Sequence, residues 1–245
     1  MQIKRKEVNG LRYYQLVDAK GQEQGLFPSI TTVLGQTSDK SGLDRWRNQV
    51  GEEEANRISQ LSLGRGNVMH RLLELYKSLS GTPDSRIEEL KNLMQEDAEV
   101  NKYPDYIQPG FEFFQKFWYN HSRFFDRIKK VLAAEQFLWS VKGGGYAGTV
   151  DNVSELVDGR VLVIDYKNSR KPKREDWIQD YFMQAAAYYV AYWERTGIKP
   201  TGAEIWIANE KDMLPQIFAL DENDIKYYFR QFSDRLKQFH ELANI

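Results

Sequence analysis

The chain has no cysteine, so disulfide bonds and thiolate metal sites are both excluded. It also lacks an apolar run long enough to span a bilayer. Its first residues have neither the apolar segment of a secretory signal nor the Arg- and Ser-rich composition of a transit peptide. No internal repeat or low-complexity tract is evident. From these absences we expect an intracellular, soluble protein with no membrane partner.

Charge of one sign is not in excess either, since 34 Lys and Arg stand against 35 Asp and Glu. A protein that grips duplex DNA over many phosphates usually has a basic face, so this balance is a caution against extensive duplex binding. Acidic clusters at residues 52–54 and 96–99 could offset a basic face elsewhere, although such runs usually form solvated helix faces. The charge balance therefore neither requires nor excludes a local basic surface.

The first half of the chain carries mainly helical signals. Its 245 residues suffice for one large domain, or for a core with an added helical part. Alternating apolar and polar residues at 11–17 predict a small hairpin, and Ser29 can cap a short helix. Gly64 and Gly66 are expected to break one helix before a new one begins. The other helices expected here cover residues 29–34, 43–50 and most of 82–130, with breaks near 103–105 and 109–110.

The second half indicates a sheet covered by helices. Two apolar runs flank Asp158 and Gly159, which suit the two-residue turn of a hairpin. The other elements expected are strands at 131–139, 203–208 and 216–220, a helix at 175–196, and a closing helix capped by Asp221 that extends to about Leu242. We therefore predict an α/β fold with a mixed central sheet flanked by helices. Residues 131–245 would form the core, and residues 1–130 a hairpin and helical region.

Three charged residues are expected to converge in that core. If the runs around residues 148–151 and 161–167 are paired strands, Asp151 and Asp165 lie close together, and Lys167 shares the face of Asp165. Two carboxylates suit a hard divalent cation such as Mg²⁺ or Mn²⁺, which can polarise a phosphodiester oxygen while a lysine orients the attacking water. The alternative is that Asp165 and Lys167 form an exposed ion pair of little energetic consequence.

The wider pattern resembles a known family. Glu135, Gly148, Asp151, the Asp165-Tyr166-Lys167 motif, Gln184 and Tyr188 follow the order found in the PD-(D/E)xK nuclease superfamily, specifically in its RecB-like branch. Residues 28–34 and 163–173 resemble most closely the mitochondrial genome maintenance exonuclease and its phage-encoded relatives. The resemblance implies a restriction-endonuclease-like core, with helices before the sheet that arch over the site and pass a single strand of DNA. The iron–sulfur versions of RecB-like nucleases are excluded, because they need four cysteines.

The resemblance also assigns roles to residues. It implies that His70, Asp151, Asp165 and the carbonyl of Tyr166 hold the metal ion. A lone histidine on a helix is more often structural, but a histidine from a helix before the sheet is a ligand in RecB-like nucleases. Glu74 shares the helix face of His70 and would orient either His70 or the helix itself. The remaining catalytic residues implied are Glu135 at the metal or its bound water, Lys167 at the attacking water, and Gln184 and Tyr188 beside the substrate or the lysine.

Several residues are candidates for contact with DNA. In the segment that contains Arg45 and Trp46, an arginine can pair with phosphate and the aromatic ring can stack on a base, whereas the alternative places Trp46 in the core. The aromatic segment at 111–119 is either a stacking platform or, as we favour, helical core. The basic candidates are Arg65 and, in a run whose alternative is a solvated loop, Arg170, Lys171, Lys173 and Arg174.

Together these features predict a Mg²⁺- or Mn²⁺-dependent DNA exonuclease. We expect it to hydrolyse single-stranded DNA from a free end, as a monomer, in DNA replication, repair or recombination. A structure-specific flap endonuclease on the same site is the enzymatic alternative, which would cut circular single-stranded DNA. A nucleic-acid-binding module without catalysis is the remaining alternative, and the paired aspartates and the lysine argue against it.

Overall fold

The computed structural model describes residues 2–18 and 20–243 and contains two sheets. The larger sheet has five strands in the order β4-β5-β6-β7-β8. All neighbours are antiparallel except β6 and β7, which are parallel and joined through helix α7 (Gln179–Thr196). The strands are β4 (Ile128–Ser140), β5 (Tyr146–Leu156), β6 (Val161–Ser169), β7 (Gly202–Asn209) and β8 (Gln216–Leu220). The predicted mixed central sheet is therefore confirmed.

The smaller sheet is an antiparallel meander at the N-terminus. Its strands are β1 (Gln2–Val8), β2 (Leu11–Val17) and β3 (Glu23–Pro28). The hairpin predicted in this part of the chain is contained in the meander, which has one strand more than a hairpin. Ser29 then forms an isolated bridge with Ala147 of β5, which links this meander to the large sheet.

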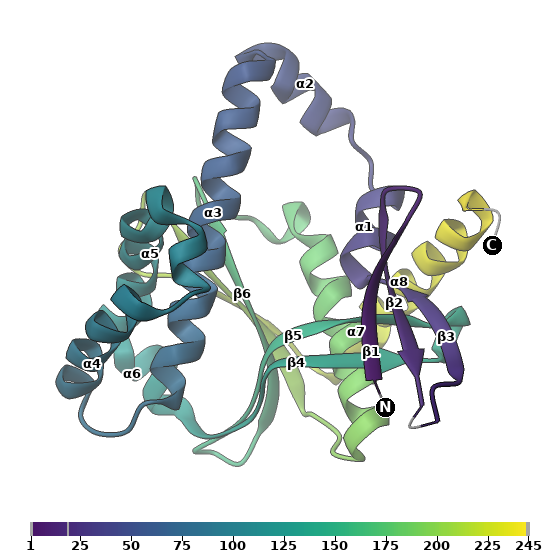
Figure 1. The fold of residues 1–245 in the computed structure, drawn as a ribbon. Coiled ribbons are helices and arrows are strands. Elements are labelled where there is room, and N and C mark those ends of the chain that lie inside the picture. The colour runs from purple at the N-terminus through teal and green to yellow at the C-terminus, as the bar shows by residue number, and fades with distance from the viewer. Residues whose placement is uncertain (1, 19, 244–245) are drawn as a thin grey trace.

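Helices cover both faces of the large sheet (Figure 1). The helices besides α7 are α1 (Ile30–Thr37), α2 (Ser41–Val50), α3 (Glu52–Ser78), α4 (Pro83–Glu96), α5 (Ile107–Tyr119), α6 (His121–Phe124) and α8 (Glu222–Leu242). Short 3₁₀ helices are η1 (Val100–Lys102), η2 (Pro104–Tyr106), η3 (Phe125–Arg127), η4 (Lys142–Gly144) and η5 (Glu175–Trp177). No helix in the described ranges is long and apolar enough to cross a membrane.

Alternation along β6 sorts its side chains between two cores. Val163 packs in a core with α1, α7 and α8, whereas Leu162 and Ile164 pack in a second core with α3 and α5. Tyr13 from the N-terminal meander belongs to the first core. The division of the chain at residue 130 stays a prediction, but side chains from before and after it share both cores.

The expected helix break at Gly64 and Gly66 is wrong, because α3 continues through both glycines. Their role is close packing. A Cβ atom on Gly64 would lie 2.1 Å from the Tyr106 ring, and one on Gly66 would lie 2.5 Å from Nδ2 of Asn168. The glycines therefore let neighbouring groups approach the helix backbone, and that gain outweighs their poor helix propensity.

The expected break at residues 109–110 is also wrong. Pro109 lies in the first turn of α5, where a missing N–H costs nothing, and Gly110 lets Val68 of α3 pack closely. Two predicted caps are confirmed. The side chain of Ser29 accepts a hydrogen bond from the N–H of Thr32, and Asp221 begins α8 with a capping box.

An arch projects beyond the sheet. It consists of α2 and the N-terminal part of α3, and its far end descends to α1 (Figure 1). None of the residues of α2 is buried. This part of the chain therefore contributes little to either core, and its inner side faces the region of the sheet that carries the charged residues described next.

Candidate active site

Pairing of β5 with β6 brings two predicted site residues together. Asn152 pairs with Ile164, so that Asp151 and Asp165 lie next to each other at the end of this ladder. The N–H of Tyr166 donates a hydrogen bond of 2.8 Å to Oδ2 of Asp151. The backbone of one strand thus fixes the carboxylate of the other.

His70 enters from α3 and approaches the same carboxylate oxygen of Asp151. Its Nδ1 lies 3.5 Å from Oδ2 of Asp151, and its ring meets the Tyr166 ring edge to face. One donor atom from each of His70, Glu135 and Asp151 lies within 4.8 Å of the others. The carboxylate of Asp165 is not a member of this group of three, although it neighbours Asp151.

Glu135 occupies an unusual backbone position. The register pairs Ala134 with Asn152 and Gln136 with Val150, which leaves Glu135 opposite Asp151. Its φ is 46°, a value that residues other than glycine rarely adopt. Its side chain is exposed. Backbone strain of this kind persists where the surroundings enforce it, and it is common at functional sites.

Asp165 is a buried carboxylate with few partners. It is 1% exposed, and neither of its oxygens accepts a well-aligned hydrogen bond from the described residues. Nζ of Lys167 lies 2.5 Å from its Oδ2 as an ion pair. Burial raises the pKa of Asp165 to about 6, even though the lysine opposes this change. A buried carboxylate with so few partners has a free-energy cost, and a further cation would satisfy the oxygen that Lys167 leaves free.

The charges of the site shift the other pKa values. Burial would raise the pKa of Asp151, but the imidazole of His70, with help from Lys167 and the N–H of Tyr166, lowers it to about 2. Burial lowers the pKa of His70, but Asp151 outweighs it, and the pKa lies above its usual value. The pKa of Lys167 is likewise raised: burial lowers it, and the two aspartates more than compensate.

Glu135 resembles Asp165 in that its pKa is raised, in contrast to that of Asp151. Although its side chain reaches solvent, the surrounding protein removes much of its hydration, and the neighbouring Asp151 repels its charge. Together these effects raise the pKa of Glu135 to about 7. Two carboxylates that repel each other beside a histidine form a donor set that fits a divalent cation. His70, Glu135 and Asp151, with the free oxygen of Asp165, are the residues that could hold one.

Lys77 is a charged residue of this region that we did not predict. It follows His70 and Glu74 on the same face of α3. This spacing in the sequence could have indicated that Lys77 lies near the site. Its Nζ lies 3.2 Å from the hydroxyl of Tyr166 and 4.9 Å from the centre of that ring. Burial lowers the pKa of Lys77 to about 8, against the charges of Asp151 and Glu135.

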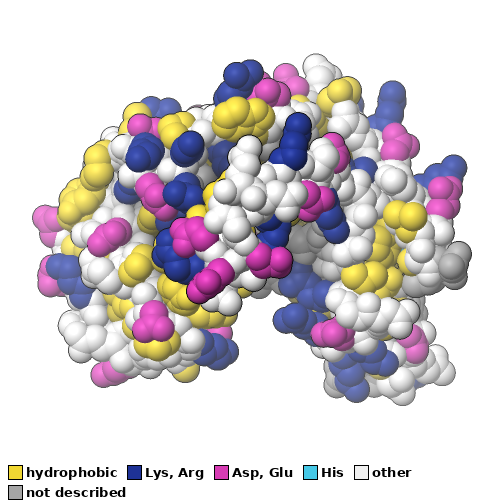
Figure 2. Space-filling view, turned by 90° about the horizontal axis from the view of Figure 1, so that it is seen from above, with side chains coloured by type: hydrophobic (Ala, Val, Ile, Leu, Met, Phe, Trp, Pro, Cys, Tyr) yellow, Lys and Arg dark blue, Asp and Glu magenta, His cyan; other side chains and the backbone are white. Residues whose placement is uncertain are grey.

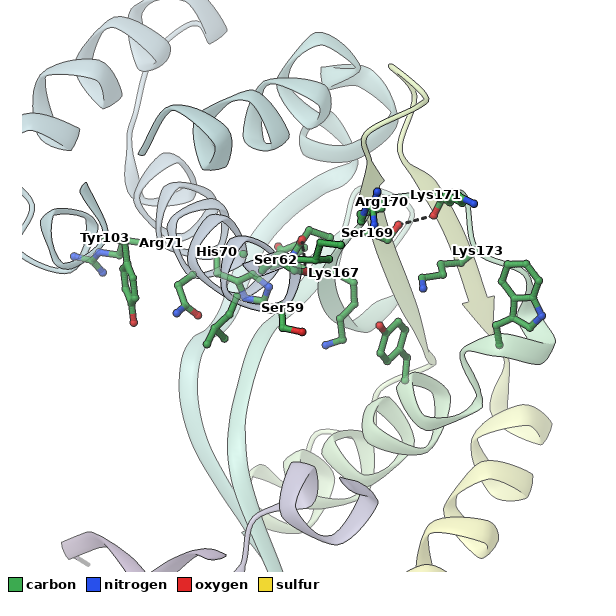
Figure 3. Close-up of a pocket in the computed structure, with 18 of the residues that line it drawn as sticks. Ser59, Ser62, His70, Arg71, Tyr103, Lys167, Ser169, Arg170, Lys171 and Lys173 are labelled. Carbon is green, nitrogen blue, oxygen red and sulfur yellow. Dashed lines mark hydrogen bonds between the residues drawn. The ribbon is translucent and has the colours of Figure 1, made fainter. Parts of the chain in front are cut away.

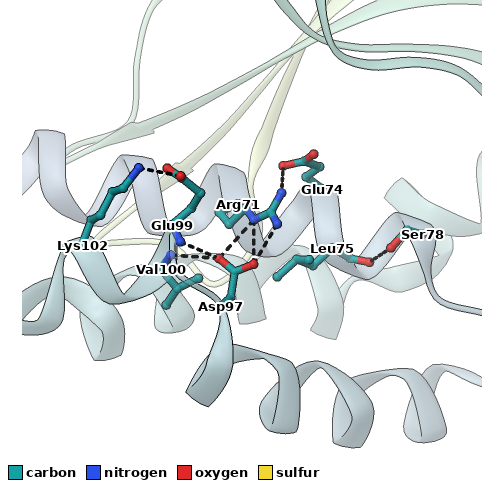
Figure 4. A network of polar contacts seen from close by, with 8 residues as sticks. All are labelled: Arg71, Glu74, Leu75, Ser78, Asp97, Glu99, Val100 and Lys102. Carbon is teal, nitrogen blue, oxygen red and sulfur yellow. Dashed lines mark hydrogen bonds and ion pairs between the residues drawn. The ribbon is translucent and has the colours of Figure 1, made fainter.

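Glu74 is held by a network rather than by His70 (Figure 4). Arg71 donates to Glu74 at 2.6 Å and, through Nη2, to Asp97 at 2.7 Å. Asp97 also accepts from the N–H groups of Glu99 and Val100. This network ties α3 to the turn after α4, and no hydrogen bond or ion pair in the described part of the chain joins Glu74 to His70.

Gln184 and Tyr188 lie buried on α7, behind the charged residues. A Cβ atom at Gly148 would lie 2.8 Å from the hydroxyl of Tyr188. Gly148 therefore allows α7 to approach β5 three residues before Asp151. Burial raises the pKa of Tyr188, with Asp151 as a further cause.

A cleft of about 1250 Å³ opens between the arch and the segment after β6 (Figure 3). His70, Glu135 and Lys167 lie on its wall. Seen from above, lysine and arginine side chains gather on one side of a notch in the surface, and acidic side chains lie on its opposite rim (Figure 2). Of the predicted DNA contacts, those that line the cleft are Trp46, Arg170, Lys171 and Lys173, while Arg45 and Arg174 are exposed outside the lining.

Arg65 is placed differently from its prediction as a DNA contact. It is 3% exposed, donates to Asn168 at 2.8 Å and forms an ion pair with Glu210. Its guanidinium also lies 4.4 Å from the centre of the Phe113 ring. Since no free face of the guanidinium reaches solvent, Arg65 links α3 to the ends of β6 and β7, and we remove it from the DNA contacts.

The aromatic segment at 111–119 packs mostly in the core, and Tyr119 at its end is exposed. Phe113, Phe114 and Phe117 are buried, and Phe117 packs against Tyr166 and Trp206. The core interpretation of this segment is thus confirmed over a stacking platform. Its aromatic rings support β6 from behind, and they do not line the cleft.

Comparison with known proteins gives the family. The model of the PD-(D/E)XK nuclease superfamily matches residues 42–244, and this chain belongs to that superfamily. Among solved structures it is similar to a candidate exonuclease from Eubacterium rectale, with 13% identity, a TM-score of 0.42, and coverage of 71% of this chain and 68% of the other.

A second similar structure is that of the protein SSO0001. It shares 16% identity at a TM-score of 0.36, over 70% of this chain and 84% of the other. Both TM-scores are low, so neither likeness carries an argument about function. The search of curated proteins found no match.

Proposed function

We propose that this protein is a Mg²⁺- or Mn²⁺-dependent deoxyribonuclease that hydrolyses single-stranded DNA from a free end. The observation that carries the proposal is the group of His70, Glu135 and Asp151, whose donor atoms lie within 4.8 Å beside the Asp165–Lys167 pair. Membership of a nuclease superfamily agrees with it. Within that superfamily we assign the chain to the RecB-like branch, near the mitochondrial genome maintenance exonuclease and its phage-encoded relatives, on the sequence motifs given above.

The proposed metal ligands are His70, Asp151, Asp165 and the carbonyl of Tyr166, with Glu135 at the ion or at water beside it. Hard oxygen donors with one imidazole suit Mg²⁺ or Mn²⁺. A divalent ion, when bound, polarises a phosphodiester oxygen and lowers the pKa of water.

Lys167 is the proposed positioning group for the reaction. Its raised pKa keeps it an ammonium near neutral pH, and Asp165 holds it at 2.5 Å. An ammonium donates protons and does not accept them, so Lys167 would orient the attacking water or stabilise negative charge on the phosphate. Gln184 and Tyr188 would keep this arrangement in place through α7.

Arg45, Trp46, Arg170, Lys171, Lys173 and Arg174 remain the proposed DNA contacts. Their positions at or near the cleft support a strand that passes under the arch towards Lys167. A strand in this position would be cut from an end. The proposed process for this activity is DNA replication, repair or recombination. A monomer suffices, since every proposed ligand comes from one chain.

The test compares linear single-stranded, duplex and circular single-stranded DNA, each labelled and incubated with Mg²⁺ or with EDTA. The proposal predicts loss of the linear single strand in Mg²⁺ alone, with the circle spared. Cleavage of the circle would replace the exonuclease with an endonuclease. Binding without cleavage of any substrate would contradict the catalytic proposal.

A further inference from the structure

The cleft beside the metal-binding group has two chemically different walls. The arch wall comes from α2 and the N-terminal half of α3; its apolar side chains are Leu43, Trp46, Ile58 and Leu63, and Ser59 and Ser62 lie among them. The basic wall comes from the segment after β6, and it consists of Arg170, Lys171 and Lys173. The first offers apolar surface and the second positive charge.

The apolar residues of the arch wall are not explained by the fold. None of the four belongs to a hydrophobic core of the described residues. Leu43 is 50% exposed and Leu63 is 66% exposed. Apolar side chains that gather on one side of a cleft usually contact a ligand, because leaving them in water has a free-energy cost.

Trp46 is an aromatic residue of the cleft whose ring packs in no core of the described residues, whereas Tyr103, which also lines the cleft, packs against the core of α3 and α5. Lys167 lies 5.2 Å from the centre of the Tyr181 ring, and Arg174 lies 5.5 Å from that of Trp177. In the described part of the chain, Trp46 makes neither an aromatic pair nor a cation–π contact. Its face is therefore available to another flat ring.

The cations on the two sides of the cleft differ in whether they are paired. On the arch side, Arg71 is already paired with Glu74 and Asp97. On the basic wall, Arg170 and Lys171 are exposed, and no ion pair of the described residues includes either of them or Lys173. Unpaired cations in a row are suited to the phosphates of a nucleic acid strand.

We propose that the cleft orients its DNA strand, with phosphates along the basic wall and unpaired bases against the arch wall, where one base stacks on Trp46. This inference rests on the proposed function and names how that site selects its substrate. A duplex cannot meet both walls in this way, because its bases are stacked inside and its phosphates face outwards on both strands. Selection for single strands then follows from the apolar arch wall rather than from the charge of the protein.

The experiment separates bases from phosphates. Fluorescence anisotropy gives the Kd of the full chain in EDTA, so that no cleavage occurs, for two probes of equal length: an oligothymidine and an oligonucleotide in which every site is abasic. The variants are Trp46→Ala and Leu63→Ala in the arch wall and Lys171→Ala in the basic wall. The matched control is Trp193→Ala, because Trp193 is 42% exposed and lies outside the cleft lining.

Trp46→Ala should weaken oligothymidine binding by about five- to a hundredfold, the usual value of one stacked base, and leave the abasic probe unchanged. Leu63→Ala should act in the same direction with a smaller loss. Lys171→Ala should weaken both probes by the same factor, and Trp193→Ala should weaken neither. Thermal melts of Trp46→Ala and Leu63→Ala identify any variant that fails to fold.

The inference is overturned if both folded arch variants weaken the two probes equally or leave both unchanged. If the wild-type protein cleaves single-stranded DNA and this result is found, the orientation alone fails. If the protein cleaves nothing in Mg²⁺ while Trp46→Ala selectively weakens oligothymidine binding, the orientation stands and the nuclease proposal fails.

Discussion

Glu135 lies opposite Asp151 across the β4–β5 ladder, with a backbone φ of 46°. The two carboxylates have donor atoms within 4.8 Å of each other and of His70. Their repulsion contributes to the raised pKa of Glu135. In the absence of a cation the protein therefore carries an electrostatic cost at this point, and a bound cation would relieve it.

Metal binding should stabilise the fold measurably. At a Mn²⁺ concentration of 100 times Kd, the free energy of unfolding should rise by about 2.7 kcal/mol through mass action. In Asp151→Asn the rise should largely disappear, since a central donor loses its charge. Asp158→Asn is the control, because Asp158 pairs with Arg160 in the β5–β6 turn. An equal rise in Asp151→Asn, measured by thermal melts, would contradict the assigned ligands.

The raised pKa of Glu135 predicts how stability depends on pH. The pKa is 4.5 for the ordinary group and about 7 in the fold, so between these values the folded protein binds more protons than the unfolded one. The contribution of Glu135 to stability is thus present below about pH 4.5 and is lost as pH rises through 7. In EDTA, Glu135→Gln should melt higher than wild type at pH 8 and close to it at pH 4.5. The same difference at both pH values would contradict the shift.

Close packing of α3 predicts an unusual response to alanine. Gly64→Ala should lower the free energy of unfolding by about 1–3 kcal/mol, because its Cβ would overlap the Tyr106 ring, even though alanine favours helices. Gly42→Ala in α2 should instead raise it by about 1 kcal/mol, since nothing lies within 4 Å of the added atom. Chemical denaturation measures both values. A stabilised Gly64→Ala would contradict the packing role.

Arg65 should prove structural. Arg65→Ala removes its bonds to Asn168 and Glu210 and should lower the free energy of unfolding by about 2 kcal/mol. Its effect on DNA binding by the folded variant should be small at every salt concentration. By contrast, Lys171→Ala should reduce the magnitude of the slope of log K against log salt by about 1, because one phosphate contact is lost. A reduced slope with unchanged stability in Arg65→Ala would restore Arg65 as a DNA contact.

The sheet was largely predictable because its signals are local. Apolar runs around Asp158 and Gly159 specify the hairpin, and Asp221 specifies the start of α8. The order of Asp151, Asp165 and Lys167 on these strands then follows from strand alternation. The strand register determines the distance between the two aspartates, because pairing of Asn152 with Ile164 brings them together.

Other features depend on contacts that are distant in sequence. Gly64 and Gly66 resemble helix breakers until Tyr106 and Asn168 are placed beside them. A basic residue such as Arg65 resembles a DNA contact until Glu210 is found next to it, 145 positions further along the chain. The positive φ of Glu135 has no sequence signal either, because this position carries no glycine or asparagine.

The most direct test of the central claim is the single-turnover rate of hydrolysis of linear single-stranded DNA in Mg²⁺ by wild type and Lys167→Ala. We predict that the variant stays folded by circular dichroism and loses at least about 100-fold in rate, since the proposed mechanism has Lys167 donate to the reacting groups. Lys237→Ala, a change at an exposed lysine on α8, should cleave like wild type. Cleavage by folded Lys167→Ala at the wild-type rate would contradict the assignment of the active site.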